Sequence, residues 1–328
     1  MMSRNRILQD LAEFGPDADR SRPSLGLEAA RERATALTLS HRENFSVLTR
    51  LVPTDVRPDF AAVYAFCRTA DDLGDEMGDP EVAARLLGWW REEIERAWAG
   101  DPGHWVFVAL QPTIERFQLD PRPFLDLVSA FEQDQLVTRY ETWDQLIDYC
   151  TRSADPVGRL VLRLLEQPLD DEIARRSDAI CTALQLTNHW QDLKRDLLER
   201  DRIYIPREMI EIEDFENRFR ASAEQGWAID DTFLEESRQL VRRCVERTWP
   251  LFELGSELPA ALDDRGAPVI RTLLSGGTSV LRLVEDWDHE TVLHRPTLST
   301  MGKLAIVARA WWDTRRTRSA PGPGRQAS

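Results

Sequence analysis

The chain has 328 residues, with 57 acidic and 42 basic side chains and a formal net charge of −15. A chain of this length can bury a substantial core within one large domain. The acidic excess argues against a general nucleic-acid binder, because contacts to phosphates need a basic surface. Any phosphate that the protein holds must be bridged by a metal ion or met by a local basic pocket.

The cysteines and the apolar segments indicate a cytoplasmic protein. Four cysteines lie among apolar residues without the spacing of a metal site, namely Cys67, Cys150, Cys181 and Cys244. They are typical of reduced, buried thiols. No stretch approaches the roughly 20 apolar residues that cross a bilayer, and the N-terminus lacks the apolar region of a signal peptide. We expect a protein that is soluble or peripheral on the inner face of the membrane. No pattern indicates its oligomeric state.

The first quarter of the chain predicts a disordered segment and two helices. Residues 1–26 mix Arg, Asp, Pro and Gly without a sustained period, so we expect disorder there. A long helix is predicted over residues 27–51, because a residue that precedes a proline such as Pro53 is pushed out of the helical region. A second helix begins near Pro58 and ends before Pro80.

A polar stripe runs along this second helix. Side chains three or four positions apart share a helical face. One such row has apolar flanks and consists of Tyr64, Arg68, Asp71 and Asp75. Carboxylates one turn apart repel each other slightly unless a cation joins them. A hard cation such as Mg²⁺, which prefers oxygen ligands, would fit. The alternative is a solvated acidic helix end.

Three more amphipathic helices are predicted next, over residues 81–98, 104–118 and 123–140, followed by a long apolar helix over residues 143–166. This long helix carries Tyr149 and is disturbed by Pro156. Gly158, two positions further on, lets a neighbouring backbone or a ligand come close. A break in this apolar helix indicates either a functional location or a kink that serves packing.

A second polar stripe follows on a helix predicted over residues 170–198. Its members are again three or four positions apart and are Gln185, Asn188, Asp192 and Asp196. Two helices packed side by side lie about 8–10 Å apart, so acids on facing surfaces can share magnesium ions and a diphosphate. Two acidic faces in one chain therefore predict two facing walls of one site.

The remainder of the chain is also predicted to be helical. Residues 202–206 leave the second acidic helix in extended form. Further helices are expected over residues 207–219, 230–254, 257–276, 278–288 and 298–317, followed by a disordered tail over residues 318–328. The chain has no internal repeat, no Gly-rich phosphate loop and no series of alternating strands. The fold class is therefore all-α, with one helical domain over residues 27–317.

Magnesium between the two stripes would turn a bound diphosphate into a leaving group. It neutralises charge and acts as a Lewis acid, so a carbon–oxygen bond can break to leave a carbocation. Arg68 would meet phosphate oxygens in forked hydrogen bonds, or else pair with Asp71 or Asp72 on its own helix. Tyr64 and Tyr149 are candidates to face the cation or the phosphate, and the alternative is a core position for each.

Four motifs, in this order, resemble the squalene/phytoene synthase family. They fall within residues 35–305 and read Tyr64-x-x-x-Arg68-x-x-Asp71-Asp72-x-x-Asp75, Tyr149-x-x-x-x-Ala154-x-x-Val157-Gly158, Gln185-x-x-Asn188-x-x-x-Asp192-x-x-x-Asp196 and Arg202-Ile-Tyr-Ile-Pro206. The resemblance implies an all-α isoprenoid-synthase bundle around a central cavity. It also implies Mg²⁺-dependent head-to-head chemistry on prenyl diphosphates.

Within that family, four segments are most similar to the bacterial hydroxysqualene synthases of the hopanoid pathway. They are His41-Arg-Glu-Asn44-Phe45, Arg68-Thr-Ala-Asp-Asp, Arg152-Ser-Ala-Asp-Pro-Val-Gly-Arg159 and Asn188-His-Trp-Gln-Asp192. Those relatives take presqualene diphosphate, eject diphosphate, rearrange the cation and trap it with water. The resemblance therefore implies Mg²⁺ as the cofactor and no nicotinamide.

The resemblance also assigns roles residue by residue. The implied magnesium ligands are Asp71, Asp75, Asn188, Asp192 and Asp196. The implied substrate-binding residues are His41, Tyr64, Arg68, Gln185, Asn188 and Arg295. Tyr149 would lie beside the cation and act in catalysis together with Asp71, Asp75 and Asp192. On its own, a single histidine on an apolar helix, such as His41, more often has a structural role.

Two positions depart from the family pattern. Many phytoene and squalene synthases have an arginine where this chain has Gln191, which disfavours holding two prenyl diphosphates unless Lys194, Arg195 or Arg295 replaces it. Asp155 stands where relatives commonly have a small or amide residue, which predicts a more polar pocket near the break.

The leading interpretation is a hydroxysqualene synthase, a carbon–oxygen lyase acting on presqualene diphosphate and water. The first alternative is a transferase that condenses two farnesyl or geranylgeranyl diphosphates to presqualene diphosphate, squalene or phytoene. The second alternative is a non-catalytic helical scaffold, which would have no physical need for intact acids in both stripes. The apolar substrate would reach the protein from the bilayer, which favours peripheral membrane contact.

Overall fold

The computed structural model describes residues 2–18, 25–40, 51–227 and 231–298. Within these ranges the chain is helical, and the only pairing of extended segments is an isolated parallel bridge between Arg139 and Ile203. The first six helices described are α1 (Met2–Phe14), α2 (Leu27–Ser40), α5 (Arg57–Asp75), α6 (Pro80–Trp98), α7 (Trp105–Phe117) and α8 (Arg122–Gln133). The all-α prediction is confirmed.

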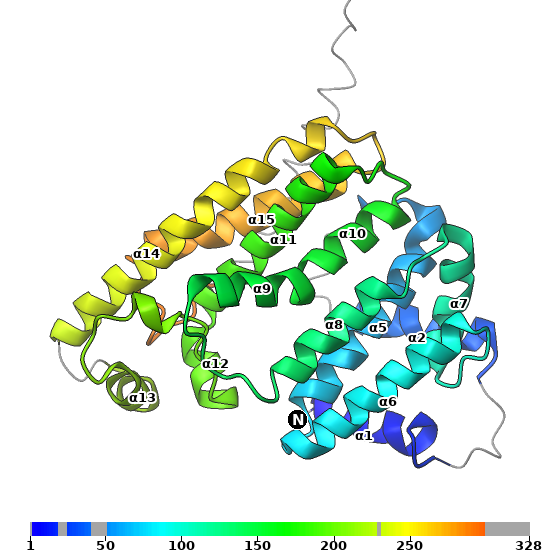
Figure 1. The fold of residues 1–328 in the computed structure, drawn as a ribbon, viewed down its shortest axis with the longest axis horizontal. Helices are drawn as coiled ribbons and strands as arrows, with labels where there is room; N and C mark the ends of the chain where they lie inside the picture. Colours follow the sequence, from blue (N-terminus) through cyan, green and yellow to red (C-terminus); the bar gives the residue numbers. More distant parts are fainter. Residues whose placement is uncertain (1, 19–24, 41–50, 228–230, 299–328) are drawn as a thin grey trace, which may run out of the picture.

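The second half of the molecule continues with α9 (Trp143–Ser153), α10 (Asp155–Leu164), α11 (Asp171–Gln191), α12 (Leu193–Arg200), α13 (Phe215–Gln225), α14 (Asp231–Gly255) and α15 (Ala267–Asp286). Figure 1 shows α1, α2 and α5–α7 at one end, α14 and α15 at the other, and α8–α10 between them.

The described helices are built around two main apolar cores. In the first, Phe66 of α5 packs against Trp90, Phe107 and Phe124. In the second, α11 packs on α14 and α15, with Trp190 fully buried. Because α5 belongs to the first core and α11 to the second, the expectation that these two helices pack side by side is wrong for the described residues.

The break predicted near Pro156 is observed. Helix α9 ends at Ser153 and α10 begins at Asp155, with Ala154 at the junction. Pro156 lies in the first turn of α10, where its missing N–H group costs no hydrogen bond. A Cβ atom on Gly158 would lie 2.5 Å from Cys181 Sγ, so the glycine permits the close crossing of α10 and α11 and confirms the predicted close approach.

Other boundaries differ from the prediction. The helix expected over residues 170–198 is two helices, α11 and α12, which meet at Asp192. The helices expected over residues 257–276 and 278–288 are largely one helix, α15. Gly277 lies within this helix, where a Cβ atom would be 2.4 Å from Leu184 of α11, so the glycine allows α15 to pack closely on α11. Three predicted segments lie mostly or wholly outside the described residues. They are the end of the helix predicted over residues 27–51, the helix predicted over residues 298–317, and the tail.

The expectation of a disordered N-terminus is wrong for Met2–Phe14, which forms α1. Ile7 is buried in the first core, and the buried Asp10 carboxylate accepts hydrogen bonds from His104 Nε2 at 3.0 Å and Trp105 Nε1 at 2.8 Å. Arg33 of α2 donates to the same carboxylate at 2.6 Å. These tertiary contacts stabilise a helix whose sequence has no clear apolar period.

Among the described helices, none combines the length and the apolar character that a membrane-spanning helix needs.

We predict that Asp10→Ala lowers the free energy of unfolding by about 3 kcal/mol, because the buried His104 and Trp105 and the half-buried Arg33 lose their acceptor. Urea unfolding of the full chain measures this loss. Asp17→Ala is the control, since Asp17 is exposed and pairs only at the surface with Arg85. An equal effect of the two substitutions would contradict the assignment of Asp10 as the anchor of α1.

Candidate active site

The first polar stripe lies on one face of α5, as predicted. Tyr64, Arg68, Asp71 and Asp75 are all half-buried. Arg68 donates to Asp71 Oδ2 at 3.0 Å and to the buried Asp72 at 2.5 Å. In this structure Arg68 therefore pairs with Asp71 and Asp72 on its own helix, which was the alternative to a phosphate contact. Partial burial and the neighbouring Asp75 carboxylate raise the pKa of Asp71.

The second polar stripe crosses the junction of α11 and α12. Gln185 is half-buried and Asn188 is exposed on α11, whereas Asp192 and Asp196 are buried. Burial and the charge of Asp192 raise the pKa of Asp196 to about 7. The four side chains thus do not lie on one regular helix, because the backbone changes direction at Asp192.

Arginines bring the two stripes together. Arg200 Nε lies 2.9 Å from Asp75 Oδ2, and Arg200 Nη1 lies 3.7 Å from Asp196 Oδ1. One guanidinium therefore contacts a carboxylate from each stripe. Arg202 donates a hydrogen bond to the other carboxylate oxygen, Asp75 Oδ1, at 3.0 Å. Asp75 and Asp196 thus lie within reach of one arginine, although α5 and α11 do not pack as a pair.

An aromatic cluster adjoins these acids. The Tyr149 hydroxyl donates to Asp134 Oδ2 at 2.8 Å, and Arg202 donates to the Asp134 carbonyl oxygen at 3.1 Å. Asp134 ends α8, and burial raises its pKa to about 7. The ring centroid of Tyr204 lies 5.9 Å from that of Tyr149 and 3.6 Å from that of His189. Arg202 thus connects the acids to an enclosed aromatic surface.

His189 is neutral in this cluster. Burial lowers the pKa of its imidazole to about 3, and the charge of Arg202 acts in the same direction. Neither ring nitrogen has a hydrogen-bond partner within the described ranges. The cluster therefore presents aromatic faces and no positive ring charge.

The segment after α15 lies against the second acidic stripe. Arg295 contacts both oxygens of Asp192, with Nη2 at 3.1 Å from Oδ2. Gln191, which stands where the family resemblance leads us to expect an arginine, donates to the Pro296 carbonyl oxygen at 2.5 Å. Arg295 thus supplies positive charge next to the position where Gln191 lacks it. His41 lies outside the described residues.

The donor set fits a divalent cation that prefers oxygen. Asp71, Asp75, Asp192 and Asp196 supply only carboxylate oxygens, and Asp134 Oδ1 is a further buried oxygen without a hydrogen-bond partner among the described residues. Among all the residues that the structure describes, no three His, Cys, Asp or Glu side chains are close enough to hold a metal ion by themselves. A cation here would take few protein ligands and complete its shell with phosphate or water, as Mg²⁺ commonly does.

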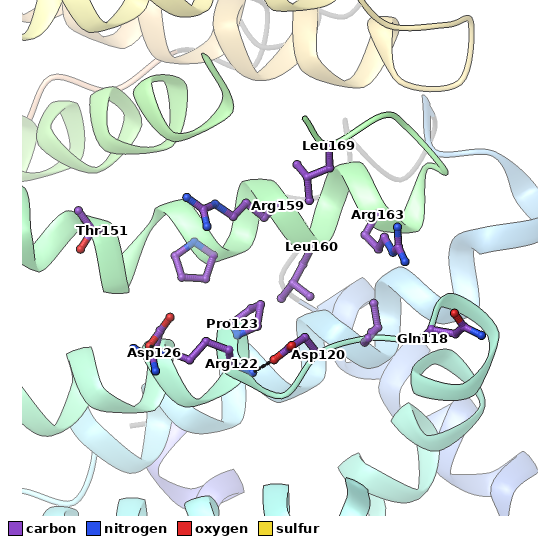
Figure 2. A pocket seen from close by; sticks show the side chains of 12 residues that line it. Gln118, Asp120, Arg122, Pro123, Asp126, Thr151, Arg159, Leu160, Arg163 and Leu169 are labelled. Atoms are coloured by element: carbon purple, nitrogen blue, oxygen red, sulfur yellow. Dashed lines mark hydrogen bonds and ion pairs between the residues drawn. The ribbon is translucent and has the colours of Figure 1, made fainter. Parts of the chain in front are cut away.

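A surface groove between α8 and α10 is a separate feature. It encloses about 360 Å³, with Pro123 and Leu160 facing each other across it (Figure 2). Its arginines are engaged, since Arg122 pairs with Asp126 and Arg159 pairs with Asp178. None of the site residues predicted from sequence lines it, so the groove is not part of the candidate active site.

Sequence reasoning missed five members of the site. Three arginines contact the acids, namely Arg6, Arg200 and Arg202. Asp134 and His189 contact the tyrosines of the aromatic cluster. Arg200 had a signal, because it lies four residues after Asp196 and so on the same face of α12. Arg202 opens a motif that was recognised without a role. Arg6 and Asp134 had no local signal, because their partners are distant in sequence.

The fold and site define an all-α protein of the isoprenoid-synthase type, with acids from two elements beside an aromatic cluster. The sequence profile of squalene/phytoene synthase matches residues 39–302. The chain belongs to the squalene/phytoene synthase family.

Individual relatives are consistent with this assignment. The hydroxysqualene synthase of Zymomonas mobilis is 36% identical over 279 residues, which cover 82% of this chain and 87% of that protein. The crystal structure of squalene synthase HpnC from Alicyclobacillus acidocaldarius is 41% identical, with a TM-score of 0.69, and the match covers 80% of this chain and 96% of that one. The 15-cis-phytoene synthase of Synechocystis is 28% identical over 321 residues, covering 94% and 91%.

The departure at Asp155 has a measurable consequence. This buried carboxylate accepts a hydrogen bond from Thr182 Oγ1 at 2.8 Å. Burial and the nearby Asp178 raise its pKa to about 7 from the ordinary 3.8. Between these two pH values the folded state binds more protons than the unfolded state, so this group lowers stability as pH rises.

We predict that Asp155→Asn raises the urea midpoint at pH 8 relative to wild type and gives a smaller gain at pH 4.5. Asparagine keeps the acceptor for Thr182 and cannot ionise. Urea unfolding at both pH values provides the measurement, with Asp148→Asn as a control that loses only an exposed ion pair to Arg152 and should not gain stability. The same gain at both pH values would show that the charge of Asp155 is not the cause.

Proposed function

We propose that this protein is a Mg²⁺-dependent hydroxysqualene synthase, which converts presqualene diphosphate and water to hydroxysqualene and diphosphate. The observation that carries the proposal is the contact of Arg200 with Asp75 and Asp196, which joins acids of both stripes next to the Tyr149 cluster. The similarity to hydroxysqualene synthase over most of both chains supports the same reaction.

The acidic stripes would hold the diphosphate end of the substrate. Arg68 and Tyr64 on α5 and Gln185 on α11 would donate to phosphate oxygens. The magnesium ligands would be Asp71, Asp75, Asn188, Asp192 and Asp196. When bound, magnesium would neutralise the diphosphate and favour its departure. Arginines that now contact these acids, such as Arg200 and Arg295, would then be free to contact phosphate oxygens.

The aromatic cluster would face the carbocation. The carbon–oxygen bond breaks with its electron pair on the leaving diphosphate, and water then forms a new carbon–oxygen bond and releases a proton. The faces of Tyr149 and Tyr204 stabilise positive charge through their π electrons. A neutral His189 avoids repelling the cation, which a charged imidazole would do.

Head-to-head condensation of two prenyl diphosphates is the second candidate. The similarity to 15-cis-phytoene synthase over nearly the whole chain favours it. Gln191 argues against it, since it removes one arginine from the diphosphate site. Arg295 beside Asp192 is the residue that could restore that charge.

The test is to supply the purified chain with presqualene diphosphate or farnesyl diphosphate, with Mg²⁺ and without nicotinamide, and to identify the lipid by mass spectrometry. We expect hydroxysqualene from presqualene diphosphate, with one oxygen from ¹⁸O-labelled water, and no turnover of farnesyl diphosphate alone. Turnover of farnesyl diphosphate alone would support condensation. No diphosphate release from either substrate would support the scaffold.

A further inference from the structure

The N-terminal helix reaches the first acidic stripe. Helix α1 precedes residues 39–302, which match the family profile. It packs on α5, and Arg6 Nη2 lies 2.5 Å from Asp72 Oδ2. The family match therefore gives no role to this arginine. The fold nevertheless places Arg6 against Asp72, the residue next to the candidate metal ligand Asp71.

Asp72 links Arg6 to Arg68. The carboxylate is buried, with its side chain 2% exposed, and each oxygen contacts a different guanidinium. Oδ2 contacts Arg6, and Oδ1 accepts a hydrogen bond from Arg68. Arg68 also donates to Asp71, so a continuous chain of ion pairs runs from α1 to a candidate metal ligand.

Helix α1 holds Arg6 firmly in this place. The buried Asp10, one turn further along α1, is hydrogen-bonded to α2 and α7 through Arg33, His104 and Trp105. Ile7, next to Arg6, is buried in the first core. The Arg6 side chain itself is 34% exposed, so it lies at the edge of the site rather than within the core.

We propose that Arg6 is a positioning residue for the diphosphate site: it shares the buried charge of Asp72 and thereby allows Arg68 to turn toward a phosphate. Breaking a buried ion pair is costly when the remaining charge has less compensation. With Arg6 in place, Asp72 keeps one guanidinium while Arg68 moves. Without Arg6, Arg68 is held more strongly by Asp72 and is less available to the ligand. The inference rests on the proposed function, because it takes Arg68 as a diphosphate ligand.

A double-mutant cycle tests the coupling between the two arginines. Isothermal titration calorimetry with inorganic diphosphate and Mg²⁺ measures affinity for wild type, Arg6→Ala, Arg68→Ala and the double variant. We expect Arg68→Ala to weaken binding about 10- to 100-fold, as is typical for a hydrogen bond to a charged group. Arg6→Ala should weaken it about 10-fold, and the double variant should match Arg68→Ala because Arg6 acts through Arg68.

Two further variants separate this role from a structural one. Arg6→Lys, which keeps one ion pair to Asp72, should recover most of the affinity. Arg85→Ala removes the contact of α6 with Asp17, just after α1, and should bind diphosphate like wild type. Urea midpoints for every variant identify any loss of stability. Affinities are compared only under conditions in which each variant is fully folded.

The outcomes distinguish the inference from the proposed function. Wild-type affinity in Arg6→Ala, or losses that add fully in the double variant, would overturn the positioning role. Failure of the wild type to bind diphosphate with Mg²⁺ would overturn the proposed function, and this inference with it.

Discussion

The structure depends on buried and half-buried carboxylates that arginines hold in place between two apolar cores. Asp75 is the central case, since Arg200 and Arg202 both contact it, and both come from the chain around the end of α12. A carboxylate removed from water without a partner is costly, so these contacts fix how the first core meets the second. The acidic stripes consequently face each other through arginines rather than through direct packing of α5 on α11.

The same arrangement suits a site in which the acids and the arginines change partners when a ligand binds. The arginines now neutralise acids, and a phosphate ligand offers them an alternative acceptor of the same kind. Mg²⁺ would take the acids that the arginines leave. The Tyr149, Tyr204 and His189 cluster contributes the opposite property, because it is buried, largely apolar and neutral. The site therefore offers charged residues for the diphosphate end of a substrate and, close by, an aromatic cluster for its apolar end.

Helical periodicity was sufficient to predict the fold class and the first stripe. Tyr64, Arg68, Asp71 and Asp75 follow one uninterrupted helix, so spacing alone places them on one face. The second stripe was harder, since α11 ends and α12 begins on either side of Asp192 and no proline or glycine in the sequence marks this break. Helix α1 and the role of Arg6 could not be predicted locally. Both arise from contacts to residues more than 60 positions away, such as Asp72 and His104.

The central claim is that the acids of α5 and those around the junction of α11 and α12 hold metal ions that bind one diphosphate. Anomalous diffraction from crystals grown with Mn²⁺ and diphosphate tests it most directly. The account predicts metal peaks at oxygens of Asp71 or Asp75 and of Asp192 or Asp196, with the diphosphate between them. Metal peaks elsewhere, with Asp75 and Asp192 still paired to their arginines, would contradict it.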